Sequence, residues 1–538
     1  MSIPSHTLCD PPSSTAVSHH RFEPLKLKQP FWRYFPIFRE ADHAFLLDSG
    51  IAPTKRGRYS FMGGFPIAVF RGDRCLPTSE PFCSNIELYR YKTPAGEPLH
   101  EHSNVTYQGD ALQELRKLLA QYAVPYLEAA RKRFPLLAGG VGYFGYEAGS
   151  WTGPGGEIKT DPSSKTPDIY FALYDTVLCH CHHTGQTFLS VVGRGKTKAE
   201  ALEETSTRSA AIRLRIDQLG ELRKPSAEQN GQSIQVETCF NELSYRQAVQ
   251  QIRSHINAGN IYQACMTQQF RSPLAGGNPW DLYCELRDHN PAPFAGFLQT
   301  PEFCVVSASP ERYLSVDAKG QAESRPIKGT RPRGATPDAD AALRDELAAS
   351  GKDRAENVMI VDLVRNDFGR VCQFQSIQVA ELMAIESYAT VFQMVSTIRG
   401  QLADGYDALD LVRASFPGGS MTGAPKIEAM KILSQLEPVR RGIYSGAIGY
   451  LDFDGLLDLN IVIRSFVIEQ GICAYGAGGA VVADSDPRSE YLESLDKIRA
   501  LQSALSQLKH RGNPIEKGDP AMKRVHPDDH ARKRLGSK

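Results

Sequence analysis

The stretch from residue 444 to residue 485 places the strongest constraint on the fold. It reads YSGAIGYLDFDGLLDLNIVIRSFVIEQGICAYGAGGAVVADS, a succession of short apolar runs separated by glycine. Runs of this length and composition, bounded by glycine turns, predict consecutive strands. A helix is predicted directly after them, because Asp486 is a favourable N-cap and Pro487 suits the first helical position. This part of the chain therefore combines a sheet with a helix that follows it.

Other segments repeat this mixture of strands and helices. AFLLDSG, YSFMGG, IAVFRG and GGVGYFGYEAG predict short strands in the amino-terminal half. Residues 243–260 predict a helix with one apolar face, for which Ser244 and Gln247 form a capping box and Gly259 ends the helix. Residues 352–369 predict another helix. The mixture indicates an α+β fold in which antiparallel sheets form a sandwich core flanked by helices.

The chain of 538 residues is long enough for more than one domain. A linker-like composition near residues 224–233 separates an amino-terminal domain at 26–225 from a second domain at 235–508. We expect the Ser- and Pro-rich leader at 1–25 and the basic tail at 511–538 to be disordered.

Composition excludes several classes of function. The 61 basic side chains balance 61 acidic ones, so we predict neither nucleic acid nor membrane as a partner. No apolar run approaches the roughly 18 residues of a membrane helix. The start lacks the pattern of a secretory signal, although a transit peptide is an alternative to a disordered leader. The 11 cysteines contain no CxxC pair, which is typical of free thiols in a reducing cytoplasm.

One cysteine- and histidine-rich segment, CHCHH at 179–183, could suggest a metal site. Strand alternation places Cys179, Cys181 and His183 on one face. No second ligand pair follows at the spacing of a zinc site, so we interpret the segment as the polar end of a hairpin.

Two predicted helices each carry a pair of carboxylates at a spacing of three residues. Asp353 and Glu356 lie on the first helix, and Glu490 and Glu493 on the second, so each pair shares one helix face. Carboxylates that converge from two helices can hold Mg²⁺ when a substrate anion supplies further ligands. Surface salt bridges are the alternative, and spacing alone favours them, because Glu493 and Lys497 are four residues apart.

Lys328 lies in the basic segment RPIKGTRPRG. With Ile327 before it and Arg331 and Arg333 after it, its ammonium form could be disfavoured, as an amine nucleophile requires. Anion binding is the alternative. The glycine-rich segments GGSMTGAPK and GAGGAVV could also present N–H groups to an anion. The first is not a nucleotide-binding loop, because Ala424 and Pro425 stand where that motif needs Lys and Ser/Thr.

Seven segments occur here in the order typical of one enzyme family: SASPERYL, RPIKGTRPRG, AENVMIVDLVRNDFGRVC, SFPGGSMTGAPKIEAM, RRGIYSGAIGYLD, NIVIRS and AGGAVVADSDPRSEYLESLDK. The chain resembles the chorismate-using enzymes, which include the large subunits of anthranilate synthase and aminodeoxychorismate synthase and the isochorismate and salicylate synthases. The resemblance covers nearly all of residues 240–505, and more weakly LLDSG and GGVGYFGYEAG. It implies that residues 235–508 form a chorismate-binding catalytic domain.

The resemblance also implies a site. Glu356 and Glu493 would hold Mg²⁺, which bridges to the ring carboxylate of chorismate, and Glu311 would be the general acid that protonates the departing C4 hydroxyl. A dianionic substrate needs cations and N–H donors, and hydroxide is a poor leaving group without a proton. The other implied substrate-binding groups are Thr330, Thr422, Tyr444, Arg464, Lys497 and the backbone of Gly478, Gly479 and Ala480.

Two positions imply a branch of the family. Gln263 stands where the water-using members carry a lysine base, so the resemblance implies ammonia as the nucleophile. Lys328 stands where anthranilate synthases carry a small residue, as in PIAGT, whereas PIKGT is typical of the aminodeoxychorismate branch. That branch implies that Lys328 attacks C2 and that ammonia then adds at C4, giving 4-amino-4-deoxychorismate for p-aminobenzoate and folate. Anthranilate synthesis and a non-catalytic subunit that binds chorismate or a partner are the alternatives.

The chain departs from the family pattern at one place. Phe392 and Gln393 occupy the positions where members often carry a histidine, so the role of Gln393 stays open. No segment resembles a glutamine amidotransferase, and the family therefore implies a separate subunit of that kind as the source of ammonia.

A tryptophan pocket is a further implication of the resemblance. Asp48 and Ser49 of LLDSG match the region where relatives bind tryptophan, and Pro293 and Phe294 of NPAPF would form the other wall. In this branch we expect any bound tryptophan to be structural rather than regulatory.

Overall fold

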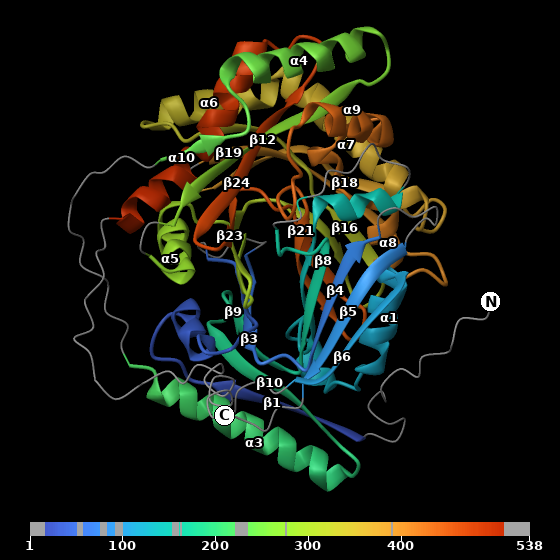
Figure 1. The fold of residues 1–538 in the computed structure, drawn as a ribbon, viewed down its shortest axis with the longest axis vertical. Helices are drawn as coiled ribbons and strands as arrows, with labels where there is room; N and C mark the ends of the chain where they lie inside the picture. Colours follow the sequence, from blue (N-terminus) through green and yellow to red (C-terminus); the bar gives the residue numbers. More distant parts are fainter. Residues whose placement is uncertain are drawn as a thin grey trace, which may run out of the picture.

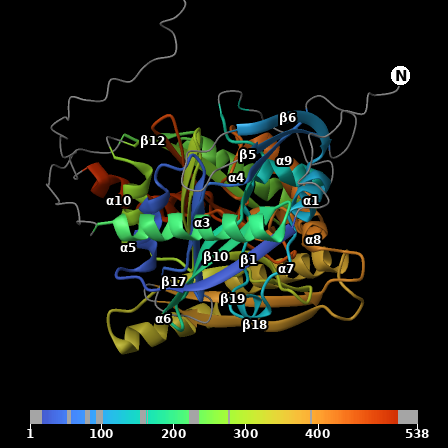
Figure 2. The ribbon, with the colours of Figure 1, turned by 90° about the horizontal axis from the view of Figure 1, so that it is seen from below.

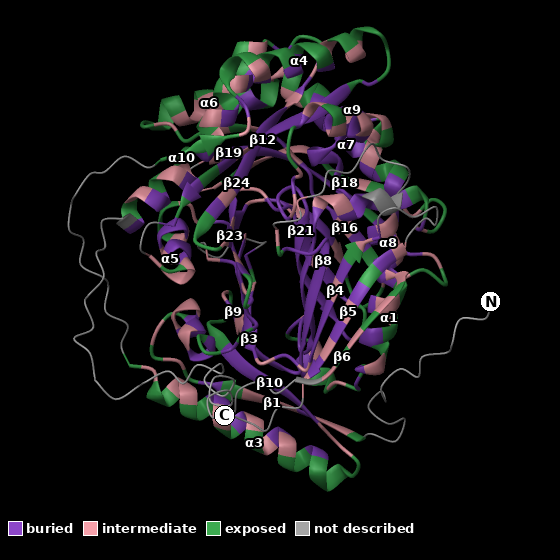
Figure 3. Ribbon diagram, in the orientation of Figure 1, coloured by how far each residue is buried: buried purple, intermediate pink, exposed green. Residues whose placement is uncertain are grey.

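The structure is a computed structural model that describes residues 17–50, 57–75, 83–91, 101–152, 161, 164–220, 235–274, 277–388 and 391–509. Two large antiparallel sheets form its core, and most of the helices lie on their outer faces (Figure 1). Buried residues concentrate in the sheets, while the outward faces of the helices are exposed (Figure 3). The predicted α+β architecture with antiparallel sheets is confirmed.

The first sheet runs in the order β1 (Val17–Leu25), β10 (Gln186–Gly195), β9 (Thr176–Cys181), β3 (Tyr59–Gly64), β2 (Ala44–Asp48), β13 (Phe294–Gln299), β14 (Phe303–Ser309), β23 (Ser465–Glu469), β24 (Ile472–Val481), β12 (Gln263–Pro273) and β11 (Glu237–Thr238), and β20 (Gly423–Ala424) pairs with β12.

The second sheet runs in the order β17 (Ile327–Pro332), β19 (Val391–Gln401), β16 (Gln321–Ser324), β15 (Arg312–Val316), β22 (Leu457–Asn460), β21 (Ala447–Asp452), β7 (Gly139–Phe144), β8 (Ile169–Tyr174), β4 (Ala68–Arg74), β5 (Cys83–Tyr91) and β6 (Glu101–Asp110), and β18 (Gln378–Ser387) pairs with β19.

The helices are η1 (Phe31–Phe38), α1 (Ala111–Gln121), α2 (Glu128–Arg131), η2 (Tyr146–Thr152), α3 (Lys198–Gln218), α4 (Glu242–Asn257), α5 (Pro279–His289), α6 (Pro337–Ala349), α7 (Gly351–Gly369), α8 (Ala408–Ser415), η3 (Gly419–Met421), α9 (Lys426–Leu436) and α10 (Pro487–Lys509). In the part of the chain that the structure describes, none of them has both the length and the apolar character needed to cross a membrane. Seen from below, α3 lies across β1 and β10 (Figure 2).

Aromatic side chains join the inner faces of the two sheets. Phe61 of β3 meets Tyr450 of β21 edge to face, with ring centroids 5.8 Å apart. Val305 of β14 and Val141 of β7 belong to the same buried cluster. Burial of such aromatic and branched side chains is the main stabilising contribution to a sandwich of this kind.

Both sheets contain strands from both predicted domains. β2 pairs with β13 in the first sheet, and β7 pairs with β21 in the second. The linker-like residues 221–234 lie outside the described residues. A division of the chain near this linker therefore does not correspond to a division of the sheets.

Two local predictions are wrong. Residues 17–25, assigned to the disordered leader, form β1, because they pair along their whole length with β10. Residues 1–16 and 510–538 lie outside the described residues. The helix predicted from residue 243 begins at Glu242, and its cap is Asn241, whose side chain accepts the backbone N–H of Ser244 at 2.8 Å. By contrast, α10 begins at Pro487 as predicted, with Asp486 accepting the N–H of Ser489 at 2.8 Å.

Candidate active site

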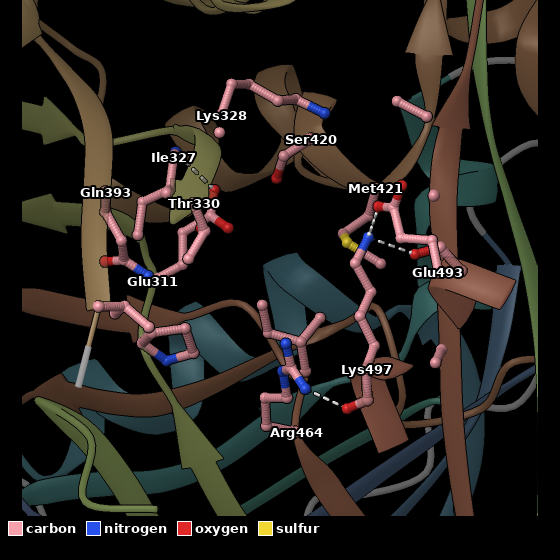
Figure 4. Close-up of a pocket in the computed structure, with 18 of the residues that line it drawn as sticks. Glu311, Ile327, Lys328, Thr330, Gln393, Ser420, Met421, Arg464, Glu493 and Lys497 are labelled. Atoms are coloured by element: carbon pink, nitrogen blue, oxygen red, sulfur yellow. Dashed lines mark hydrogen bonds and ion pairs between the residues drawn. The ribbon is translucent and has the colours of Figure 1, made fainter. Parts of the chain in front are cut away.

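A cavity of about 650 Å³ lies between the first sheet, β17, α7 and α10. Figure 4 shows the side chains that point into it. Most of the residues predicted for the site line this cavity: Glu311, Lys328, Thr330, Glu356, Tyr444, Arg464, Gly478, Gly479, Ala480, Glu493 and Lys497. Residues that are far apart in the sequence are thus brought to one place.

The glycines of β24 allow the backbone to form one wall of this cavity. Gly478 pairs with Thr267 of β12, and a Cβ at this position would lie only 1.9 Å from the carbonyl oxygen of Met266. A Cβ on Gly479 would lie 2.7 Å from Oε2 of Glu490. Glycine is required at position 478, because two backbones approach more closely there than a side chain allows, whereas at position 479 a side chain would displace the carboxylate.

The four carboxylates predicted on α7 and α10 differ in their burial and in their partners. Asp353 lines the cavity as well, but its carboxylate pairs with Arg331, with an N–O distance of 3.1 Å. Glu356 and Glu490 are buried, and burial raises the pKa of both carboxyl groups. For Glu493 the same effect of burial is outweighed by Lys497, 2.6 Å away, so its pKa is lowered. The salt bridge that the spacing suggested is present, but it does not account for the two buried carboxylates.

The residues present fit a Mg²⁺ ion that a substrate helps to hold. Among the described residues, no three His, Cys, Asp or Glu side chains form a ready-made metal site. Oε2 of Glu490 is nevertheless buried without a hydrogen-bond partner, beside Gly479. Mg²⁺ characteristically takes one or two carboxylates and completes its shell with water and substrate oxygens. The donor set is therefore of the right chemistry, with positions left for a substrate carboxylate.

Lys328 extends into the cavity from an irregular part of β17. The pairing of β17 with β19 shifts between Ile327 and Thr330, and Gly329 between them has a φ of 84°. The Lys328 side chain is buried, and its Nζ lies 3.9 Å from Oε2 of Glu356. An amine held in this way faces the space in which a substrate ring would lie.

The arginines that follow Lys328 in the sequence pair with carboxylates in the structure. Arg331 pairs with Glu346 at 3.0 Å, and Arg333 pairs with Asp340 at 2.6 Å. Their charges are balanced by carboxylates of α6, and an effect of these arginines on Lys328 stays a prediction.

Glu311 lies between β14 and β15, on the side of the cavity where Gln393 and Thr330 also lie (Figure 4). Burial raises the pKa of this carboxyl group to about 7, against the opposing influence of the Lys328 charge, the Ile327 amide and the Ser420 hydroxyl. A carboxyl group that keeps its proton near neutral pH is suited to act as a general acid.

Arg464 and Lys497 supply positive charge at the opposite side of the cavity. Nζ of Lys497 donates to the carbonyl oxygen of Gly478 at 2.7 Å and pairs with Glu493. Arg464 donates to the backbone carbonyl of Lys497, and burial lowers the pKa of its guanidinium group. The two cations are fixed to the backbone, which suits them to hold a substrate carboxylate.

Two predicted site residues do not line the cavity. Gln263 is fully buried at the start of β12, where it pairs with Ala424, and neither polar atom of its side chain has a hydrogen-bond partner. Thr422 is fully buried as well, and its carbonyl accepts the N–H of Cys265 at 2.7 Å. Gln263 is covered by its pairing with β20, and a contact of either residue with the substrate stays a prediction.

The structure distinguishes the two positions at which relatives often carry histidine. Gln393 lines the cavity, whereas Phe392 packs on the other side of β19 with Leu347 and Met394. Lys352, Ser420 and Met421 also line the cavity and were not predicted. Lys352 could have been found, because it precedes Glu356 by one helical turn.

The four residues of the predicted tryptophan pocket do not surround one cavity. Asp48 lines a second cavity of about 780 Å³, while Pro293 lines the main one. Oδ2 of Asp48 already accepts Nε of Arg287 at 2.6 Å and the Tyr283 hydroxyl at 2.9 Å, and Ser49 donates to the carbonyl of Pro293 at 3.0 Å. Phe294 carries the guanidinium of Arg312 over its ring. Tryptophan binding stays a prediction.

The segment CHCHH ends a hairpin, with Cys179 and Cys181 in the core and His183 exposed. None of the ten cysteines among the described residues forms a disulfide.

Known proteins resemble this chain over most of its length. A family model described as chorismate binding enzyme matches residues 83–503. Aminodeoxychorismate synthase component 1 from Klebsiella aerogenes is 38% identical, with 87% of this chain and 95% of that protein covered. Anthranilate synthase component 1 from Aquifex aeolicus is 34% identical, with 86% and 88% covered.

Longer relatives and a solved structure match as well. The chloroplastic aminodeoxychorismate synthase of Arabidopsis thaliana is 37% identical over 86% of this chain, and the chain spans about half (50%) of its length. The crystal structure of anthranilate synthase component I from Streptococcus pneumoniae superposes with a TM-score of 0.68 at 26% identity, covering 83% of this chain and 92% of that one. With the family model matching most of its length and the cavity assembled from the family's motifs, the chain belongs to the chorismate binding enzyme family.

Proposed function

We propose that the chain is the chorismate-binding component of an aminodeoxychorismate synthase, which converts chorismate and ammonia into 4-amino-4-deoxychorismate. The family and the names of several relatives support the substrate. The observation that carries the choice of product is Lys328, a buried amine that extends into the cavity between Glu311 and Glu356. A small residue at this position would leave C2 of the substrate open to ammonia.

The two carboxylates of chorismate would be held by the cationic side of the cavity. Arg464 and Lys497 are fixed to backbone carbonyls there, and Glu356 and Glu493 would hold Mg²⁺. A bound Mg²⁺ would neutralise the ring carboxylate and anchor it. The substrate ring would then lie beneath Lys328, with its C4 hydroxyl on the side of Glu311.

The first displacement uses Lys328 and Glu311. The neutral amine of Lys328 forms a bond to C2, the conjugated ring double bonds shift, and the C4–O bond breaks. Glu311 gives its proton to the departing hydroxyl, which leaves as water, and the resulting carboxylate can take the proton that the new C2 ammonium loses. The raised pKa of Glu311 supports this role, because the group must be protonated at the start.

The second displacement places nitrogen at C4. Ammonia forms a bond to C4, the double bonds shift back, and the bond between C2 and Lys328 breaks. The lysine recovers a proton as the new amino group loses one, so the net reaction consumes chorismate and ammonia and releases water. We propose that a separate glutamine amidotransferase chain supplies the ammonia, as the component 1 names of the relatives suggest.

Anthranilate synthesis is the second candidate, and relatives of that name match this chain at 34% identity. It requires ammonia to reach C2 directly. Lys328 weighs against it, because its side chain occupies the approach that ammonia would need.

Product analysis tests the proposal. The purified chain would be incubated with chorismate, Mg²⁺ and ammonium, and the products separated by chromatography with mass detection. We expect 4-amino-4-deoxychorismate from the wild type and from Lys431→Ala, a surface lysine paired with Glu428. Lys328→Ala should lose this product or shift to amination at C2. Anthranilate as the wild-type product would overturn the proposal, and unchanged chorismate at every ammonium concentration would indicate a binding subunit.

A further inference from the structure

Lys352 places an ammonium group between the two helices whose carboxylates form the candidate metal site. It lies in the first turn of α7 and lines the cavity. Its Nζ is 4.0 Å from Oε1 of Glu356, one turn further along the same helix, and 3.6 Å from Oε1 of Glu490 on α10. A single cation thus bridges the two helices at the place where a metal ion would join them.

The carboxylates of this site are all faced by lysines in the structure. Glu356 has Lys328 at 3.9 Å as well as Lys352, and Glu493 has Lys497 at 2.6 Å. Lys497 also donates to the carbonyl oxygen of Gly478, and Lys352 is the lysine that contacts both Glu356 and Glu490. Lys352 is therefore the cation that belongs to the pair Glu356 and Glu490.

The contacts of Lys352 are loose compared with those of a metal ion. Oxygen ligands approach Mg²⁺ to about 2.0–2.1 Å, roughly half the distances found for Nζ of Lys352. Oε2 of Glu490 is buried without a hydrogen-bond partner, and that residue is only 3% exposed. The arrangement holds an anionic oxygen that the lysine leaves unsatisfied and that a closer cation could satisfy.

The ammonium group of Lys352 can also move away from Glu356 and Glu490 into solvent. Its side chain is 53% exposed, so the ammonium can move into water without being buried elsewhere. Ion pairs of such partly exposed lysines contribute little to stability. A divalent ion could therefore replace the lysine at small cost to the fold.

We propose that Lys352 is the resident cation of the metal site in the metal-free protein, and that a divalent ion held by Glu356 and Glu493 displaces it into solvent, because the ion and the lysine compete for Glu356. This inference rests on the proposed function, because it takes the carboxylates of α7 and α10 as the metal site. Lys352 then lowers metal affinity and keeps the carboxylates from repelling one another when no metal is bound.

Direct metal binding tests this inference without turnover. Binding of Mn²⁺ to the full chain, in the absence of chorismate, would be measured by electron paramagnetic resonance at fixed ionic strength. Lys352→Met should bind Mn²⁺ about three- to tenfold more tightly than the wild type, because it removes a competitor from two partly exposed ion pairs. Lys352→Arg keeps the charge and should stay close to the wild type. Lys431→Met, which loses only a surface pair with Glu428, should not change the affinity.

A second measurement on the wild type does not depend on whether a variant folds. The rate at which an N-hydroxysuccinimide ester acetylates Lys352 would be followed by peptide mass spectrometry with and without Mn²⁺. Displacement predicts faster labelling of Lys352 when Mn²⁺ is added, with Lys431 as the internal reference.

The outcomes separate the two proposals. If the wild type binds Mn²⁺ but Lys352→Met binds it no more tightly and labelling is unchanged, the competition is overturned while the metal site stands. If neither protein binds Mn²⁺, the competition and the metal ligands of the proposed function are both overturned. Binding by Lys352→Met alone would support the inference in its strongest form.

Discussion

The backbone nitrogen of Ile327 donates a hydrogen bond to Oε1 of Glu311, with an N–O distance of 3.3 Å (Figure 4). The residue that precedes Lys328 therefore helps to position the carboxyl group assigned as the acid. The proposed nucleophile and the proposed acid are coupled through a single peptide unit of β17.

The pH dependence of the reaction should follow Glu311. Its pKa is raised to about 7 by burial, and the protonated form is the reactive one, so kcat/KM should fall as the pH rises through about 7. Measurement between about pH 5.5 and about pH 8.5 covers both sides of this value. Ser420→Ala removes a hydroxyl that favours the ionised form, and it should move the decline to higher pH. If kcat/KM of the wild type did not change with pH over this range, Glu311 would not be the general acid.

Replacement of Glu311 by Gln should lower kcat about 100-fold or more, because a positioned general acid contributes about 10²–10⁴-fold. Chorismate binding should change little, since the cationic groups that hold the carboxylates are untouched. Equilibrium binding of chorismate, measured by calorimetry, supplies the control. A variant that loses binding and turnover together would indicate a structural role for Glu311.

Gly478→Ala should destabilise the fold by about 2–3 kcal/mol, because the new methyl group would be forced against the backbone of Met266 and Thr267. The matched control is Gly351→Ala, which meets nothing within 4 Å at the start of α7. Urea denaturation compares the two variants. Equal midpoints for both would contradict the close packing of β24 on β12.

Gly479→Ala should behave differently from its neighbour. The atoms that its methyl group would meet are Oε2 of Glu490 at 2.7 Å and Oε1 of Glu493 at 3.5 Å, which are the ends of flexible side chains. We expect nearly unchanged stability but weaker Mn²⁺ binding, because the carboxylates must move. If this variant bound Mn²⁺ as tightly as the wild type, Glu490 and Glu493 would not belong to the metal site.

Arg441→Met should destabilise the protein by about 3–5 kcal/mol, because it removes the positive charge that pairs with the buried carboxylate of Glu437. Arg441 donates to Glu437 at 2.6 Å and to the carbonyl oxygens of Met421 and Cys265, both of which line the cavity. The double variant Arg441→Met with Glu437→Met should recover part of the loss. Urea midpoints for the single and double variants measure it, and a greater loss in the double variant would refute the argument.

The elements that sequence predicted well are those set by local signals. The run at 444–485 forms β21 to β24, and α10 begins at Pro487 after its Asp486 cap. These features depend on residues close together in the chain. The resemblance to a family likewise located most of the cavity wall, because it carries information on contacts that are distant in the sequence.

The features that sequence did not predict depend on distant partners. β1 forms because β10, about 170 residues later, pairs with it. The charges of Arg331 and Arg333 are balanced by α6, and Gln263 is covered by β20. The spacing of residues along the chain does not indicate contacts between distant segments. The ion pairs of the arginines and the burial of Gln263 could therefore not be predicted.

The interleaving of the two halves in both sheets has a consequence for synthesis. β2 and β7 emerge early, but their partners β13 and β21 begin about 250 and 300 residues later. Until those partners are made, each early sheet ends in an open edge, and such edges can pair with other chains. Contacts between residues so far apart also slow folding. The nascent amino-terminal half is therefore the stage at which this protein is most exposed to aggregation, and the point at which a chaperone would matter most.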